Sequence, residues 1–333
     1  MASFKHGEYA AQIAFLRRSD TFSAAARGGG GSYAGKPRAF VLPAGAEPEN
    51  LWQGFRDEIA RYFRQHGIVW HRARAHLLSS QVCCINFLEA FAHRPAALRA
   101  MLQPVLGPIE TMLPPEPKEE PSRYVAYEAI GAHNYLNEAS PGAPRTKGAN
   151  FTSADAAVRL RRPDGSVETC LIEWKYTESY GRPRPDDRRH PTRRQRYAPI
   201  AFAPDGPVRA DRGLKLDDLL TEPIYQLFRQ QMLAFQMERA HEENAVRVSV
   251  LHVSPAGNVA LHENRIAPLQ RFDGTIFSVW KSLIAVPERF AAVTTSRLFA
   301  ALPALVAGDP TLVGWHRYVT DRYAGALAPA GVT

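Results

Sequence analysis

Two charged residues stand inside an otherwise apolar stretch of this sequence. Residues 167–176 favour a β-strand, yet Glu173 and Lys175 flank Trp174 near its end. Side chains alternate along a strand, so these two charges project from the same face, about 6.5–7 Å apart. A buried charge is costly unless it is paired or binds a metal. The pattern therefore indicates that Glu173 and Lys175 are functional residues on a buried strand.

A tight turn precedes this strand and fixes what lies beside it. Pro163 and Asp164 suit the centre of a type I turn, and Gly165 suits the left-handed position of a bulge. Arg162 would then pair with Ser166. A two-residue turn remains an alternative, and it would shift the register by one residue.

With the longer turn, Asp155 of the preceding strand lies directly opposite Glu173. Two opposed carboxylates repel each other unless a cation lies between them. Carboxylate oxygens are hard ligands that suit Mg²⁺ or Mn²⁺, with water completing the shell. With the shorter turn, the two carboxylates would lie on opposite faces of the sheet.

The arrangement of Asp155 on one strand and Glu173-Trp174-Lys175 on the next resembles the PD-(D/E)XK, or restriction-endonuclease-like, nuclease superfamily. Ala154 stands where the named motif has proline. Residues 70–255 resemble one bacterial branch of that superfamily. The matching positions are Ser79, Ser80, Gln81 and Asn86, then Glu128, then Glu173, Lys175, Tyr176, Thr177 and Glu178, and finally Tyr225, Gln226, Leu227 and Arg229.

This resemblance implies metal-assisted hydrolysis of phosphodiester bonds. Asp155 and Glu173 would hold Mg²⁺ or Mn²⁺, with Glu128 and the backbone carbonyl of Trp174 as further ligands. Lys175 would orient the attacking water and offset charge in the transition state. Gln226 would orient the lysine or contact phosphate. The competing interpretation is a solvated hairpin whose Glu and Lys form surface pairs.

An arginine-rich segment follows the expected catalytic strand. Its seven arginines are Arg182, Arg184, Arg188, Arg189, Arg193, Arg194 and Arg196. The chain also has a formal net charge of +8, which favours an anionic partner. We expect a loop that contacts nucleic-acid phosphates, DNA first, with RNA left open. An Arg-rich surface insertion, or a GC-rich genome that inflates arginine, would give the same composition.

These residues need a scaffold, and the patterns predict an α/β domain with a mixed central sheet and flanking helices. We expect a flexible arm over residues 1–45, because Gly28–Gly31 and two prolines follow one another there. One nuclease-like domain would occupy 46–333, with an N-terminal helical part (46–120), a restriction-endonuclease-like core (121–255) and C-terminal helices (256–333). Expected strands are 124–130, 153–162, 167–176 and 245–253; expected helices are 51–67, 80–92, 96–106, 216–241, 275–285, 294–306 and 310–324.

Other function classes are disfavoured by composition. No apolar window approaches the roughly 18–20 residues of a membrane span, and no export signal is evident. Three cysteines, two of them adjacent, do not make a disulfide scaffold, so we expect a reducing cytoplasm. The first hypothesis is a DNA nuclease of restriction or defence type. A repair-type exonuclease on the same fold, a non-catalytic nucleic-acid-binding protein, an unrelated helical partner-binding protein and a homodimer all stay open.

Overall fold

The centre of the molecule is a six-stranded mixed sheet. The computed structural model describes residues 3–28, 30–139, 145–148, 151–180 and 189–329. The strands are β3 (Thr111–Leu113), β4 (Ala126–Ala129), β5 (Ala154–Arg161), β6 (Val167–Trp174), β7 (Arg247–Ser254) and β8 (Phe290–Thr294). β3 and β4 both pair with β5, and β6, β7 and β8 follow in that order. β5 and β6 are antiparallel, whereas β7 and β8 run parallel to β6.

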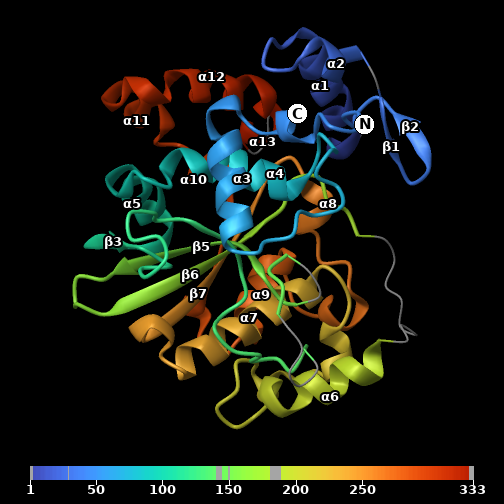
Figure 1. Ribbon diagram of the computed structural model, residues 1–333. Coiled ribbons are helices and arrows are strands. Elements are labelled where there is room, and N and C mark those ends of the chain that lie inside the picture. Colours follow the sequence, from blue (N-terminus) through green and yellow to red (C-terminus); the bar gives the residue numbers. More distant parts are fainter. Residues whose placement is uncertain (1–2, 29, 140–144, 149–150, 181–188, 330–333) are drawn as a thin grey trace.

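Helices cover both faces of this sheet (Figure 1). Above it in the view lie α3 (Arg56–Gln65), α4 (Ser80–Leu88), α5 (Pro95–Leu106), α10 (Thr295–Leu298), α11 (Leu302–Gly308), α12 (Val313–Arg322) and α13 (Ala324–Leu327). Below it lie α6 (His190–Ala201), α7 (Ile224–Arg239) and α9 (Ile276–Leu283). A short helix, α8 (Val259–His262), follows β7. Short 3₁₀ helices occupy Glu47–Asn50, Gln53–Phe55, Glu89–Phe91, Ala210–Arg212, Leu216–Leu219, Glu242–Asn244, Ala267–Leu269, Pro287–Arg289 and Pro310–Leu312.

The central strands are therefore buried on both faces. Val158 and Ile172 belong to the core beneath α4, whereas Leu171 and Val250 belong to the core against α7. A strand covered on both sides reads as a nearly continuous apolar run. This is why the charges at the end of β6 stand out so clearly in the sequence.

The expected turn between β5 and β6 is confirmed. Gly165 has φ +81°, the left-handed conformation that glycine adopts without strain. The N–H of Arg162 donates to the carbonyl of Ser166 at 2.8 Å. The ladder that follows pairs Val158 with Cys170 and Ala156 with Ile172. The register is the one that brings Asp155 to the side of Glu173.

The first 45 residues are not the flexible arm that we expected. Within the described residues they form α1 (Phe4–Arg18), α2 (Ala24–Gly28), β1 (Gly31–Tyr33) and β2 (Lys36–Arg38). The amide of Gln12 donates to the hydroxyl of Tyr176 and to the carbonyl of Arg322, each at 2.9 Å. Glu8 and Gln12 are buried, so part of the packed face of α1 is polar. Apolar periodicity cannot detect such a face.

Other boundaries differ from the expected ones for local reasons. The helix expected over 216–241 is divided, because α7 begins only after Pro223. The arginine-rich segment expected as a loop forms α6 over its second half. β3 and β8 were not expected, since strands of three and five residues carry little periodicity.

A search of the described residues for membrane-spanning helices finds no single candidate. One pair, Thr295–Gly308 with Pro310–Arg322, passes on length and composition only when joined across a 120° bend.

Candidate active site

Three carboxylates lie next to one another at one end of the sheet. Glu128, Asp155 and Glu173 belong to the adjacent strands β4, β5 and β6. The β4–β5 register places Glu128 beside Asp155, and the β5–β6 register, continued by one step, places Asp155 beside Glu173. At that step the carboxylate of Asp155 accepts a hydrogen bond from the main-chain N–H of Trp174 at 2.7 Å. The side chain of Asp155 thus lies against the end of the expected catalytic strand.

Glu173 is buried and held from two sides. The ammonium of Lys175 lies 2.6 Å from its Oε1, and the amide of Gln230 donates to its Oε2 at 2.9 Å. The side chains of Glu173 and Lys175 are only 7% and 12% exposed. Gln230 also donates to the carbonyl of Ser153 at 2.6 Å, which ties α7 to the start of β5. This is a rigid pair rather than a mobile surface ion pair.

Glu128 is fixed by three neighbours. Gln81 of α4 donates to its Oε1 at 2.7 Å, and Ser153 donates to its Oε2 at 2.9 Å. The ring of His71 lies 3.3 Å from Oε1, and this hydrogen bond raises the pKa of His71. Glu128 also has φ +50°, a strained conformation for a residue with a side chain. Such strain is typical of functional sites and is held by the surrounding contacts.

The charges in this corner perturb one another. Burial, followed by the nearby negative charge of Glu173, raises the pKa of Asp155 well above its usual range. Burial alone would lower the pKa of Lys175, but the negative charges of Glu173 and Asp155 outweigh it and raise that pKa. Lys175 therefore stays protonated at neutral pH. Burial and the charge of Glu173 disfavour the ionised form of Asp155, whereas a cation bound beside the two carboxylates would favour it.

A cavity of about 350 Å³ opens beside these groups. Asp155, Trp174 and Lys175 line one part of it, and His71 and Gln81 line another. The substrate side of the candidate site is therefore accessible, although Glu173 itself is buried.

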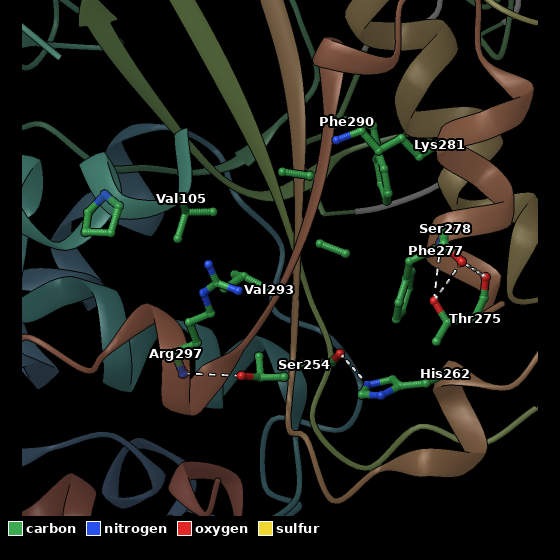
Figure 2. Close-up of a pocket in the computed structure, with 14 residues that line it drawn as sticks. Val105, Ser254, His262, Thr275, Phe277, Ser278, Lys281, Phe290, Val293 and Arg297 are labelled. Atoms are coloured by element: carbon green, nitrogen blue, oxygen red, sulfur yellow. Dashed lines mark hydrogen bonds between the residues drawn. The ribbon is translucent and has the colours of Figure 1, made fainter. Parts of the chain in front are cut away.

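A second cavity, of about 440 Å³, lies along the edge strand β8 (Figure 2). Val105 lies on one side of this strand, and Phe277, Ser278 and Lys281 lie on the other. None of the residues that line it is acidic. It therefore lacks the carboxylates that the expected chemistry needs.

The donor set of the first cavity fits a hard divalent cation. Mg²⁺ is usually held by one or two carboxylates, with water and substrate phosphate as the other ligands. Asp155, which lines the cavity, and its buried neighbour Glu173 on β6 supply two such carboxylates. Among the described residues, no three His, Cys, Asp or Glu side chains form a ready-made metal cage.

The seven arginines of the expected phosphate-binding loop are only partly described. Arg182, Arg184 and Arg188 lie outside the described residues. Arg194 of α6 forms a two-pronged, exposed pair with Asp217, both contacts being 2.7 Å. Arg196 donates to the carbonyl of Glu138 at 3.3 Å, and Arg193 stacks over the Tyr225 ring at 4.0 Å. Arg189 directly precedes α6. The DNA contact of this segment stays a prediction.

Several residues around the carboxylates escaped the sequence analysis. Gln230 lies one helical turn after Gln226, and it is Gln230 that contacts Glu173. The i, i+4 spacing of these two glutamines was the available signal. The buried Oε1 of Gln226 has no hydrogen-bond partner among the described residues. Glu222 lies just before α7. Burial raises the pKa of Glu222, and the positive charge of nearby Lys175 partly counteracts this rise.

The polar residues of α4 divide into two roles. Gln81 reaches Glu128, as described above, and therefore belongs to the candidate site. Asn86 instead accepts from the N–H of Trp52 at 2.8 Å and donates to the hydroxyl of Tyr323 at 2.9 Å. Asn86 is a hydrogen-bonding group of the core.

A mixed sheet that carries adjacent carboxylates and a lysine at one end defines a nuclease of the restriction-endonuclease-like class. The chain belongs to the REase-ARP family, whose model, described as "Restriction Endonuclease associating with ARP", matches residues 14–324. The resemblance seen in the sequence is thereby confirmed. The protein is a hydrolase of a restriction endonuclease family, which implies DNA cleavage in defence. No curated protein and no solved structure matches the chain.

Replacing Gln230 with methionine should raise the Mg²⁺ concentration needed for half-maximal DNA cleavage by about 10- to 100-fold. Methionine fills the same space but cannot donate to Glu173, so the carboxylate loses its fixed orientation. Cleavage rates measured over a Mg²⁺ titration check this. Gln236→Met, the same change six residues further along α7, is the matched control. An unchanged Mg²⁺ dependence in Gln230→Met would show that Gln230 only packs.

Proposed function

We propose that this protein hydrolyses phosphodiester bonds of DNA with Mg²⁺ or Mn²⁺ bound by Asp155 and Glu173, as part of a restriction-type defence. The observation that carries the proposal is that Glu128, Asp155 and Glu173 lie on adjacent strands, and that Asp155 and Lys175 line an open cavity. A divalent cation there supplies a more acidic water and neutralises phosphate charge.

The residues of the chain divide the remaining work. Lys175, held protonated by its acidic neighbours, lies where it can orient the attacking water and offset charge on the phosphate. Gln230 orients Glu173, and Gln81, Ser153 and His71 hold Glu128. The carbonyl of Trp174 as a ligand and Gln226 as a phosphate contact remain part of the proposal. The seven arginines would bind phosphates further from the site.

A non-catalytic DNA-binding protein is the alternative of a different class. A site that has lost catalysis need not retain costly buried acids, whereas here Glu173 pairs with Lys175, Gln81 holds Glu128, and the N–H of Trp174 holds Asp155. This arrangement favours the enzyme. A partner called ARP appears in the family description, and we include association with such a partner in the proposal.

Circular and linear DNA distinguish the candidate functions. With Mg²⁺ or Mn²⁺, the purified protein should nick or linearise a circular plasmid, and EDTA should abolish this cleavage. Degradation of linear DNA alone would indicate the repair-type exonuclease. Binding without cleavage of either DNA under both metals would contradict the catalytic proposal.

A further inference from the structure

The cavity beside Asp155 and Lys175 has a second side that comes from the start of the chain. Lys5 and Tyr9 of α1 and Tyr33 of β1 line it. Lys36 pairs with Tyr33 across the β1–β2 hairpin, and Arg38 follows on the same strand. Lys36 and Arg38 belong to the same hairpin but lie outside the lining of the cavity. We call the set Lys5, Tyr9, Tyr33, Lys36 and Arg38 the N-terminal wall.

The N-terminal wall is attached directly to the catalytic strand. Tyr176 comes one residue after Lys175, and its hydroxyl bonds to Glu8 and to Gln12 of α1. The wall therefore has a defined position relative to the ammonium of Lys175. A substrate bound by the N-terminal wall would therefore be positioned next to Lys175.

The hairpin is held in place by close backbone contacts. The N–H of Gly31 donates to the carbonyl of Val41 at 2.7 Å, and Val41 bridges to His76. A Cβ at Gly31 would lie 2.1 Å from the carbonyl oxygen of Leu42, so only glycine fits there. The hairpin thus lies against the segment that leads into α4, beside the cavity.

The wall is basic, whereas the opposite side of the cavity is acidic. Lys36 and Arg38 are exposed and Lys5 is half-buried, and the wall contains no carboxylate. Burial, together with the positive charge of Lys5, lowers the pKa of His76 to about 4, so this neighbour is neutral at pH 7. Tyr33 is 47% exposed, and its ring meets His76 edge-on at 5.2 Å. It presents an aromatic surface to the solvent.

We propose that the N-terminal wall binds the DNA strand on either side of the phosphate that is cut. Lys5, Lys36 and Arg38 hold flanking phosphates, and Tyr33 packs against a sugar or base. The acids opposite repel phosphate unless they are neutralised, so a strand in the cavity needs cations on this side. The inference rests on the proposed function, because it takes the cavity as the place where DNA is cut.

The test compares two triple variants in the Asp155→Asn background, so that DNA binding is measured without cleavage. Lys5→Ala/Lys36→Ala/Arg38→Ala should weaken binding of a labelled duplex and reduce the slope of log K against log salt by about 3, near 0.9 per lost contact. The control, Lys118→Ala/Arg161→Ala/Arg247→Ala, removes the same charge from residues outside both the cavity lining and the β1–β2 hairpin. Its slope should change by less than about 1.

A slope and affinity unchanged by the wall variant, or reduced equally by both variants, would overturn the inference. Tyr33→Ala should weaken binding by about tenfold without changing the slope, because it removes no charge. Unchanged binding by Tyr33→Ala would remove the aromatic contact. If wild type fails to cleave DNA while the wall variant still lowers the slope, the proposed catalysis fails and the binding site stands.

Discussion

Replacing Asp155 with asparagine should abolish metal-dependent DNA cleavage, with a loss of at least about 10³-fold. A metal ligand contributes several kcal/mol to lowering the barrier, and each 1.4 kcal/mol corresponds to about tenfold in rate. The fold should survive, because asparagine keeps the shape of the side chain and can still accept from the N–H of Trp174. Cleavage rates and denaturant unfolding of the same preparation check both expectations.

The stability of this variant separates a functional role from a structural one. Burial and the charge of Glu173 raise the pKa of Asp155, so its ionised form is disfavoured in the folded protein. A raised carboxyl pKa means that the stability contribution is full at low pH and is lost as pH rises through that pKa. Removing the charge should therefore leave the free energy of unfolding at pH 8 unchanged or higher.

Two further variants complete the experiment. Asp164→Asn makes the same change at the turn end of the same hairpin, where Asp164 bonds to Ser166, and it should cleave like wild type. Lys175→Met should lose cleavage yet still bind Mg²⁺ in calorimetry, because both carboxylates remain. Wild-type cleavage by Asp155→Asn would show that Asp155 is not a catalytic residue.

Replacing Arg123 with methionine should lower the free energy of unfolding by about 3–5 kcal/mol. Arg123 is 3% exposed and donates to the carboxylate of Glu89, which is 1% exposed, and to Glu58 at 3.0 Å. Tyr127, next to Glu128 on β4, also donates to Glu89, at 2.9 Å. The variant leaves Glu89 buried without its cation. Urea unfolding at pH 8 measures the loss.

The loss of stability in Arg123→Met should depend on pH, because it comes from the ionised form of Glu89. Burial raises the pKa of Glu89, although Arg123 counteracts it, so removing Arg123 raises that pKa further. A raised carboxyl pKa costs stability only above the unfolded value of about 4.3. The difference in the free energy of unfolding between wild type and Arg123→Met should therefore be smaller at pH 4 than at pH 8. The double variant Arg123→Met/Glu89→Leu should recover much of the loss; an equally unstable double variant would show that packing of Arg123, not its charge, matters.

The β5–β6 hairpin was predictable because residues adjacent in sequence determine its turn. Pro163, Asp164 and Gly165 define the turn, the turn defines the register, and the register brings Asp155 beside Glu173. Only a few neighbouring residues are needed to predict this register. The choice of Glu128 as the glutamate before the hairpin came from family resemblance, whereas the pairing of its strand with β5 appears only in the structure.

Features that depend on distant partners were not predictable. The buried face of α1 is partly polar, and the partners of its Gln12, Tyr176 and Arg322, lie more than 160 residues away in sequence. Gln226 and Gln230 are indistinguishable until the approach of α7 to β6 decides which one meets Glu173. His71 joins the site only because the segment before α4 folds back toward Glu128. Tertiary packing determines these contacts, and the hydrophobic periodicity of the sequence does not reveal them.

Gln12 bonds both to Tyr176 and to the carbonyl of Arg322, so α1 and α12 meet beside the residue that directly follows Lys175. During synthesis, the acids and the lysine emerge from the ribosome well before residue 322. Until residue 322 has been made, Tyr176, which follows Lys175 directly, lacks the part of its support that Gln12 relays from α12.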